Sequence, residues 1–278
     1  MTYSTVMVHM DVGSANDAVL RVAAAFAERF KASVIGIAAC QPVPIMYSDG
    51  CTSGDMIHAD LVELAKETAE AEASFRAALH GTAVGLTWRS ITGRVPLADY
   101  IVQEARAADI IITGPDLGWS ALDASRRVAV SDVVLHAGRP VLIVPPKAEE
   151  LSLESVVVGW TDTREARRAI TDALPLLKRA ARVSVVEIEA ADADDVAAAQ
   201  GRLVDVVAWL GRHGVVSEPI AAVSIGDDAA QLQAIAEDKR AGVMVAGAYG
   251  HNRLREWVLG GVTRDILVRP ARCSLVSH

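Results

Sequence analysis

The chain has 278 residues, a formal net charge of -8 and three cysteines, and 51% of it is hydrophobic. This length accommodates two domains of ordinary size, and the negative charge argues against a general nucleic-acid surface. No apolar run reaches the length of a membrane span, and the amino terminus lacks the basic and apolar pattern of a signal peptide. We therefore expect a cytoplasmic protein with reduced thiols and with neither a nucleic-acid nor a membrane partner.

Apolar runs and amphipathic patterns alternate along the first half of the chain. The predicted strands cover 5–10, 33–39, 84–91, 109–113 and 140–144, and the predicted helices cover 16–30, 60–79, 96–106 and 125–136. A long loop at 41–58 contains two prolines and two glycines. The Pro- and Glu-containing stretch 145–150 has the composition of a linker.

The same order of elements recurs in the second half. Predicted strands cover 155–160, 183–188, 215–223, 243–246 and 273–276, and predicted helices cover 164–181, 195–212, 227–239 and 263–268. Asp11 aligns with Thr161 at an offset of 150 residues, whereas Gly114 aligns with Gly247 at an offset of 133. The sequence thus predicts an internal repeat. Its domains are 1–148, which carries the extra loop 41–58, and 152–278.

Each copy alternates strands with helices, which predicts an α/β fold with a doubly wound, five-stranded parallel sheet and right-handed crossovers. The strands at 140–144 and 272–277 lie at the margins of their sheets. Because exposed strand edges favour pairing, we expect these two edges to meet inside one chain. The two copies would then pack as a pseudo-twofold pair.

A glycine-rich stretch follows the apolar run 243–246. It contains Gly247, Gly250, Gly260 and Gly261, and then Thr263 at the start of a helical pattern. Glycines let the backbone approach a ligand closely, and the free N–H groups at a helix start favour phosphate. The spacing is neither that of a P-loop nor that of a dinucleotide-binding motif. The stretch therefore predicts either an anion site or a glycine-rich turn without a ligand.

The spacing G-x2-G-x9-G-G resembles the ATP-binding signature of the universal stress protein family, with Gly261 where the family usually has Ser or Thr. The resemblance covers nearly the whole chain as two tandem copies of an adenine-nucleotide α-hydrolase-like fold, similar to a family dimer fused into one polypeptide. It implies ATP as the ligand, alone or with Mg²⁺. The residues that the resemblance places around it are Thr161, Ala246, Gly247, Tyr249, Gly250, Gly260, Gly261, Val262 and Thr263.

The two copies differ at the residues that matter for this site. In the family an Asp at the end of the first strand contacts adenine or ribose, and this residue is Asp11 in the first copy but Thr161 in the second. The glycine pair of the second copy aligns with Arg127 and Val128 in the first. Side chains there would fill the space of a phosphate, although Arg127 could itself pair with one. We therefore expect ATP chiefly in the second copy.

The resemblance implies a nucleotide-binding protein of stress response or signalling, with ATP as a structural or regulatory ligand. Two alternatives remain: a nucleotide-independent interaction scaffold and a slow nucleotide hydrolase. No nucleophile–base pair, paired carboxylates or Walker-type lysine supports catalysis. The protein partner and a further homodimer stay open.

Other polar residues carry weaker hypotheses. Asp49, Cys51, Asp55, His58 and Asp60 could gather on a metal, but loops are usually polar without one. Cys40 and Cys51 could form a redox pair, although idle thiols are commoner. His9 lies on an apolar strand, which favours a buried core histidine.

Overall fold

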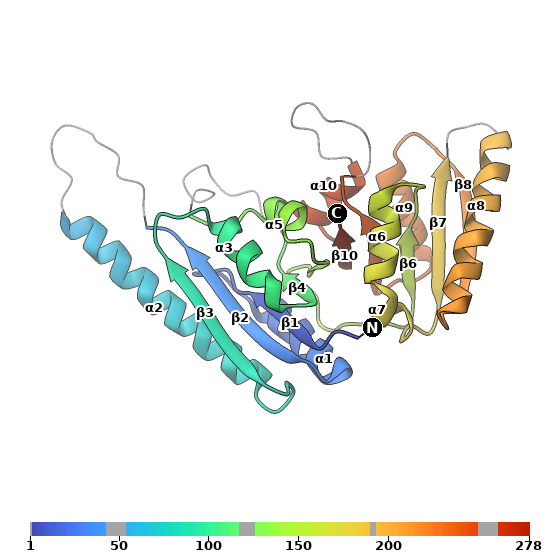
Figure 1. Cartoon of the computed structure of the whole chain (residues 1–278). Coiled ribbons are helices and arrows are strands. Elements are labelled where there is room, and N and C mark those ends of the chain that lie inside the picture. Colours follow the sequence, from blue (N-terminus) through green and yellow to red (C-terminus); the bar gives the residue numbers. More distant parts are fainter. Residues whose placement is uncertain (1, 43–53, 117–125, 190–192, 250–260) are drawn as a thin grey trace, which may run out of the picture.

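The computed structural model describes residues 2–42, 54–116, 126–189, 193–249 and 261–278 (Figure 1). The first half contains β1 (Thr5–His9), α1 (Asp17–Phe30), β2 (Ser33–Cys40), α2 (Gly54–Leu79), β3 (Leu86–Thr92), α3 (Leu97–Glu104), the 3₁₀ turn η1 (Ala105–Ala107), β4 (Ile110–Thr113), α5 (Val130–His136) and β5 (Val141–Ile143). The second half contains β6 (Val156–Gly159), α6 (Arg164–Asp172), α7 (Leu174–Leu177), β7 (Val183–Glu189), α8 (Ala193–Arg212), β8 (Ser217–Val223), α9 (Asp228–Asp238), β9 (Val243–Gly247), α10 (Gly261–Val268) and β10 (Cys273–Ser277).

The described strands form a single ten-stranded sheet in the order β3-β2-β1-β4-β5-β10-β9-β6-β7-β8. Each half is parallel throughout, and the two halves are joined by the antiparallel pair β5–β10, in which Leu142 lies opposite Leu275. This junction lies at the centre of Figure 1. The predicted fold class is confirmed, and so is the expected meeting of the two strand edges.

The strand register supports the two repeat offsets. Val6 of β1 pairs with Ile110 of β4. The residues 150 and 133 positions further along, Val156 of β6 and Val243 of β9, also pair. The two halves therefore share the order and register of their central strands, so that a position in one half can be compared with its counterpart in the other.

Helices cover both faces of the sheet, which is why the central strands are apolar on both sides. Helices α1, α2, α6, α7 and α8 pack on one face, and α3, α5, α9 and α10 pack on the other. The side chains of Ile110, Ile111 and Ile112 in β4 are completely buried. The Tyr3 hydroxyl also ties the halves together, since it donates to the Asp172 carbonyl at 2.6 Å.

Three helices differ from their predicted bounds by more than two residues. The predicted helix 164–181 is divided into α6 and α7, because Pro175 in the first turn of α7 has no N–H to continue the hydrogen-bond ladder. Helix α5 starts at Val130 rather than near residue 125. Helix α2 starts at Gly54, inside the stretch predicted as loop 41–58, most of which lies outside the described residues.

Within the described part of the chain, no helix combines the length and the apolar character needed to cross a bilayer.

Candidate functional site

The strand order reverses direction at two places, between β1 and β4 and between β6 and β9. In a doubly wound sheet, a crevice opens at such a switch point, outside the carboxyl ends of the strands. Asp11 follows β1 and Gly114 follows β4, whereas Thr161 follows β6 and Gly247 ends β9. The fold therefore places the aligned residues of the two copies at two corresponding switch points.

In the first half, Asn16 organises the turn that carries Asp11. The Asp11 N–H donates to the Asn16 side-chain oxygen at 2.9 Å, and the Asn16 amide donates to the carbonyls of Asp11 and Ser14, both at 2.9 Å. These bonds satisfy the turn internally, as Asn side chains often do. The Asp11 carboxylate is thereby held at the mouth of the crevice.

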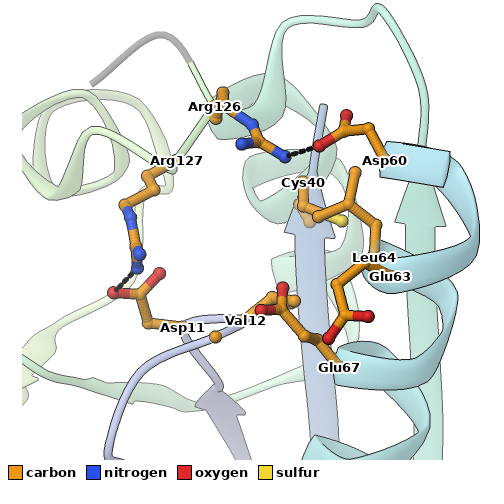
Figure 2. Close-up of a pocket in the computed structure, with 11 residues that line it drawn as sticks. Asp11, Val12, Cys40, Asp60, Glu63, Leu64, Glu67, Arg126 and Arg127 are labelled. Atoms are coloured by element: carbon orange, nitrogen blue, oxygen red, sulfur yellow. Dashed lines mark hydrogen bonds and ion pairs between the residues drawn. The ribbon is translucent and has the colours of Figure 1, made fainter. Parts of the chain in front are cut away.

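Two adjacent arginines cross this crevice (Figure 2). Arg127 Nη1 lies 2.6 Å from Asp11 Oδ2 and donates to Ser14 Oγ at 2.7 Å. Arg126 Nη2 donates to Asp60 Oδ1 on α2 at 2.7 Å. Arg127, which aligns with the glycine pair of the second half, therefore lies directly against the aspartate that follows the first strand.

The space left between these side chains is a cavity of about 170 Å³. Ligand pockets typically measure about 300–1,000 Å³, so this cavity is small for a nucleotide. The described residues that line it contribute four carboxylates and two guanidinium groups, at Asp11, Asp60, Glu63, Glu67, Arg126 and Arg127. A triphosphate would meet net negative charge there, since both arginines are already paired with carboxylates.

His9 lies beneath the same crevice and is 7% exposed. Its Nδ1 is 2.9 Å from Thr113 Oγ1 on the neighbouring strand β4. Burial lowers the pKa of the His9 ring, and the nearby Asp11 carboxylate only partly offsets this effect. His9 is therefore a neutral, hydrogen-bonded core residue, as its apolar strand predicts.

In the second half, the structure brings Thr161, Ala246 and Gly247 to neighbouring strand ends. Gly159 of β6 pairs with Ala246 of β9, so that Thr161 lies just beyond this pair. Thr161 is exposed. These predicted site residues therefore lie together at the carboxyl ends of β6 and β9.

Close packing also explains why residue 247 is a glycine. A Cβ at this position would lie 2.6 Å from the backbone of Glu165 and Ala166, in the first turn of α6. Helix α6 begins after Thr163, whose hydroxyl caps it by accepting from the Ala166 N–H at 3.3 Å. The glycine that the sequence analysis assigned to ligand approach thus also allows β9 and α6 to meet closely.

Tyr249 follows β9 with a left-handed backbone, at φ 64°. Its ring meets the His278 ring edge-on at 5.8 Å between centroids, so the side chain leans toward β10, whereas Thr161 lies on the β6 side. Burial raises the pKa of the Tyr249 phenol to about 12, helped by Asp132 and Asp116. Its hydroxyl is buried without a hydrogen-bond partner among the described residues.

The remaining predicted site residues belong to the glycine stretch. Gly250 and Gly260 lie outside the described residues. Gly261, Val262 and Thr263 form the first turn of α10, where the sequence predicts a helix start. Their roles as ligand-binding residues stay predictions.

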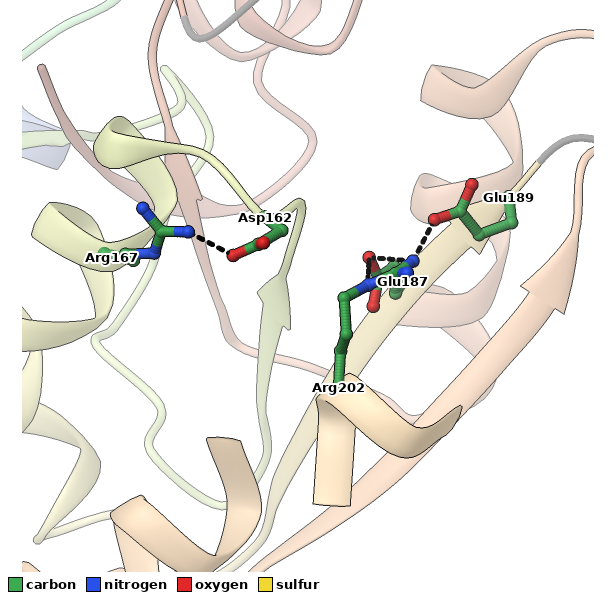
Figure 3. A network of polar contacts seen from close by, with 5 residues as sticks. All are labelled: Asp162, Arg167, Glu187, Glu189 and Arg202. Carbon is green, nitrogen blue, oxygen red and sulfur yellow. Dashed lines mark hydrogen bonds and ion pairs between the residues drawn. The ribbon is translucent and has the colours of Figure 1, made fainter. Parts of the chain in front are cut away.

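A group of ion pairs that the sequence pattern does not indicate lies near the carboxyl ends of β6 and β7 (Figure 3). Arg202 of α8 reaches Glu187 at 2.9 Å and also pairs with Glu189, both at the end of β7. Asp162 pairs separately with Arg167 at 2.5 Å. By the strand register, Glu187 and Glu189 correspond to Ala38 and Cys40 of β2, so the first half has no carboxylates at these two positions.

Glu187 is only 2% exposed, and burial raises the pKa of its carboxyl although Arg202 acts in the opposite direction. Its Oε2 has no hydrogen-bond partner among the described residues, and neither does the indole N–H of the adjacent Trp160. The Trp160 backbone N–H donates to Val186 at 2.7 Å, which places Trp160 and Glu187 side by side. Buried polar atoms are normally hydrogen-bonded, so this end of the sheet has unused binding capacity.

The hypothesis of a metal site gains no support. No group of three His, Cys, Asp or Glu side chains is placed for a metal within the described ranges. Asp60 is paired with Arg126, and Asp49 and Cys51 lie outside those ranges. Cys40 is a free, buried thiol.

These features define a class: a tandem, doubly wound α/β protein with two corresponding switch points in its strand order. No protein-family model matches the sequence, and neither does any curated protein. A universal stress protein from Archaeoglobus fulgidus DSM 4304 has a similar structure, with a TM-score of 0.75, 13% identity, and coverage of 98% of this chain and 95% of that one. A functionally unknown protein from Pseudomonas aeruginosa PAO1 gives a TM-score of 0.62 at 14% identity, with 99% and 92% of the two chains covered. The chain has the universal stress protein fold, in two tandem copies.

Proposed function

We propose that this chain is a tandem universal stress protein that binds ATP, alone or with Mg²⁺, chiefly in its second copy, residues 152–278. The ligand contacts are those of the glycine stretch and the facing strand end. They comprise Thr161, Ala246, Gly247, Tyr249, Gly250, Gly260, Gly261, Val262 and Thr263.

The observation that carries the proposal is the position of the G-x2-G-x9-G-G stretch. It connects the end of β9 to the start of α10, next to the β6–β9 switch point. A helix start at this position presents backbone N–H groups and a positive dipole end to the crevice, which suits a phosphate chain. The unused polar atoms of Trp160 and Glu187 lie at the same end of the sheet.

The first crevice supports this choice by contrast. Its aspartate is paired with Arg127, its cavity is small, and carboxylates outnumber cations in its lining. A nucleotide there would have to break the Asp11–Arg127 pair and enter a site of net negative charge. In the second copy, Thr161 and Gly260 stand at the positions of Asp11 and Arg127, so an ion pair between these two positions cannot form.

We propose a structural or regulatory role for ATP in stress response or signalling. A nucleotide that binds only the native state stabilises it by mass action, and this can couple nucleotide level to the conformation of the protein. A bound nucleotide would also lie close to the junction of the two copies, because β9 is the immediate neighbour of β10.

Mass spectrometry of small molecules released from freshly purified protein tests the proposal. We expect an adenine nucleotide in near-stoichiometric amount, or saturable ATP binding by the ligand-free protein. A protein that carries no nucleotide and is not stabilised by added ATP would instead favour a nucleotide-independent scaffold. Multiple-turnover release of ADP would indicate a hydrolase.

A further inference from the structure

A second cavity, of about 410 Å³, lies where the first half of the chain leads into the linker. Its lining includes Pro145 and Pro146, just after β5, and Gly242 and Cys273, at the starts of β9 and β10. The amino ends of β9 and β10 form part of the wall of this cavity, whereas the proposed nucleotide site lies at the carboxyl end of β9. The two sites are therefore separate, and the volume of this cavity is typical of small-molecule pockets.

The walls of this cavity are mainly apolar. Pro145, Pro146 and Pro270 have no backbone N–H, and Ala148 and Ala271 add small apolar side chains. Such a lining offers few hydrogen bonds to water. It favours an apolar ligand body, whose burial releases about 25 cal/mol for each Å² removed from water.

Arg272 is one of the charged residues in this lining. Its Nη1 donates to the Ala241 carbonyl at 3.0 Å, but its buried Nε–H has no acceptor among the described residues. No carboxylate of the described chain forms an ion pair with it. Burial lowers the pKa of the Arg272 guanidinium, and the more distant Glu237 only partly compensates. Arg272 as a whole is half-buried, and a partly desolvated cation is stabilised when an anion pairs with it.

The rest of the lining also favours an anion. Lys147 adds a second cation that makes no ion pair with the described residues, and Glu150 is the single carboxylate among the lining residues. Burial raises the pKa of the Cys273 thiol to about 12, so it stays protonated and neutral at physiological pH. The cavity is thus locally positive in a chain of net charge -8.

We propose that this cavity binds a small carboxylate with an apolar tail, of the size of a medium-chain fatty acid. The carboxylate pairs with the Arg272 guanidinium, and the tail lies against the proline and alanine walls. Charge-assisted hydrogen bonds from a guanidinium to a carboxylate are short and directional, so the headgroup fixes the orientation of the ligand.

The repeat provides a matched control. Arg139 aligns with Arg272 and similarly donates to a backbone carbonyl, that of Arg106, at 3.5 Å. Arg139 does not line the cavity at the linker. A substitution at Arg139 therefore removes a hydrogen bond from an arginine to a backbone carbonyl and leaves the proposed site intact.

Isothermal titration calorimetry of the full chain with octanoate tests the proposal. We expect saturable one-to-one binding, and Arg272→Gln should weaken it by at least about tenfold, the loss of one charge-assisted contact. Ala271→Trp should abolish binding, because the exposed Ala271 side chain borders the cavity and a larger one blocks it. Arg139→Gln should bind octanoate as the wild type does.

Three results would overturn the proposal: no saturable octanoate binding, equal binding of octylammonium, or undiminished binding by folded Arg272→Gln. If Arg272→Gln does not fold, Ala271→Trp decides, and octanoate binding by this variant at wild-type affinity also overturns the proposal. ATP stabilisation measured on the same samples should be unchanged by Ala271→Trp, which separates this site from the proposed nucleotide site.

Discussion

The carboxylate of Asp11 is paired with the guanidinium of Arg127 at 2.6 Å, and these residues mark the two positions at which the copies diverge. Asp11 aligns with Thr161, and Arg127 aligns with the glycine pair of the second copy. The first copy therefore has an aspartate at one position and, where the second copy has a glycine, an arginine that pairs with this aspartate. This pairing gives a physical reason for treating the two crevices as different sites.

The first prediction separates the two copies as nucleotide sites. Gly260→Val should remove the stabilisation that ATP gives, because a side chain there occupies the space proposed for phosphate. Arg127→Val, the matched change in the first copy, should leave that stabilisation in place. Thermal unfolding with and without ATP measures both, since a ligand specific for the native state raises its melting temperature. Equal losses in the two variants would show that the first copy also binds ATP.

A second prediction concerns the strength of the Asp11–Arg127 pair. The two side chains are 30% and 21% exposed, so solvent screens their attraction only in part. A double-mutant cycle with Asp11→Asn and Arg127→Gln should give a coupling free energy of about 1 kcal/mol in denaturant unfolding. The coupling should fall as salt is added. Strict additivity of the two substitutions would mean that the pair contributes nothing to stability.

The third prediction tests why Gly247 is a glycine. Gly247→Ala should lower the free energy of unfolding by about 1–3 kcal/mol, because its Cβ would push into the backbone of α6. Gly114→Ala is the matched control. Its Cβ would come no closer than 3.8 Å, to Val19, so its effect should stay within about 0.5 kcal/mol. Chemical denaturation of both variants makes the comparison, and equal stability of the two would refute the packing explanation.

The fourth prediction concerns pH. The folded-state pKa of Glu187 lies above its ordinary value of 4.5, so folding favours the protonated form. The protonated Glu187 carboxyl therefore contributes to stability below pH 4.5, and this contribution is lost as the pH rises through the higher pKa of Glu187 in the folded state. Glu187→Gln, which is neutral at every pH, should therefore gain stability relative to the wild type as pH rises from 4 to 7. Urea unfolding across this range reports the difference, and the opposite trend would contradict the burial effect.

Much of the architecture follows from sequence pattern alone. Apolar runs such as 110–113 predict buried strands, and the recurrence of strand and helix predicts two doubly wound copies. The offsets that align Asp11 with Thr161 and Gly114 with Gly247 agree with the strand register. These features could be predicted because hydrophobic periodicity is local and a parallel sheet restricts how the elements connect. The break at Pro175 was missed, although its cause is also local.

The tertiary structure alone decided which side chains meet. Asp11 and Arg127 are 116 positions apart in the sequence, and nothing in the spacing indicates that they pair. The same holds for Arg202 with Glu187, for the backbone of α6 against Gly247, and for the cavity beside Arg272. Such contacts depend on how helices and linkers pack against the sheet, and a difference of an ångström in packing makes or breaks an ion pair. Sequence pattern determines which residues lie at the carboxyl ends of the strands, whereas packing determines which of these residues remain available to a ligand.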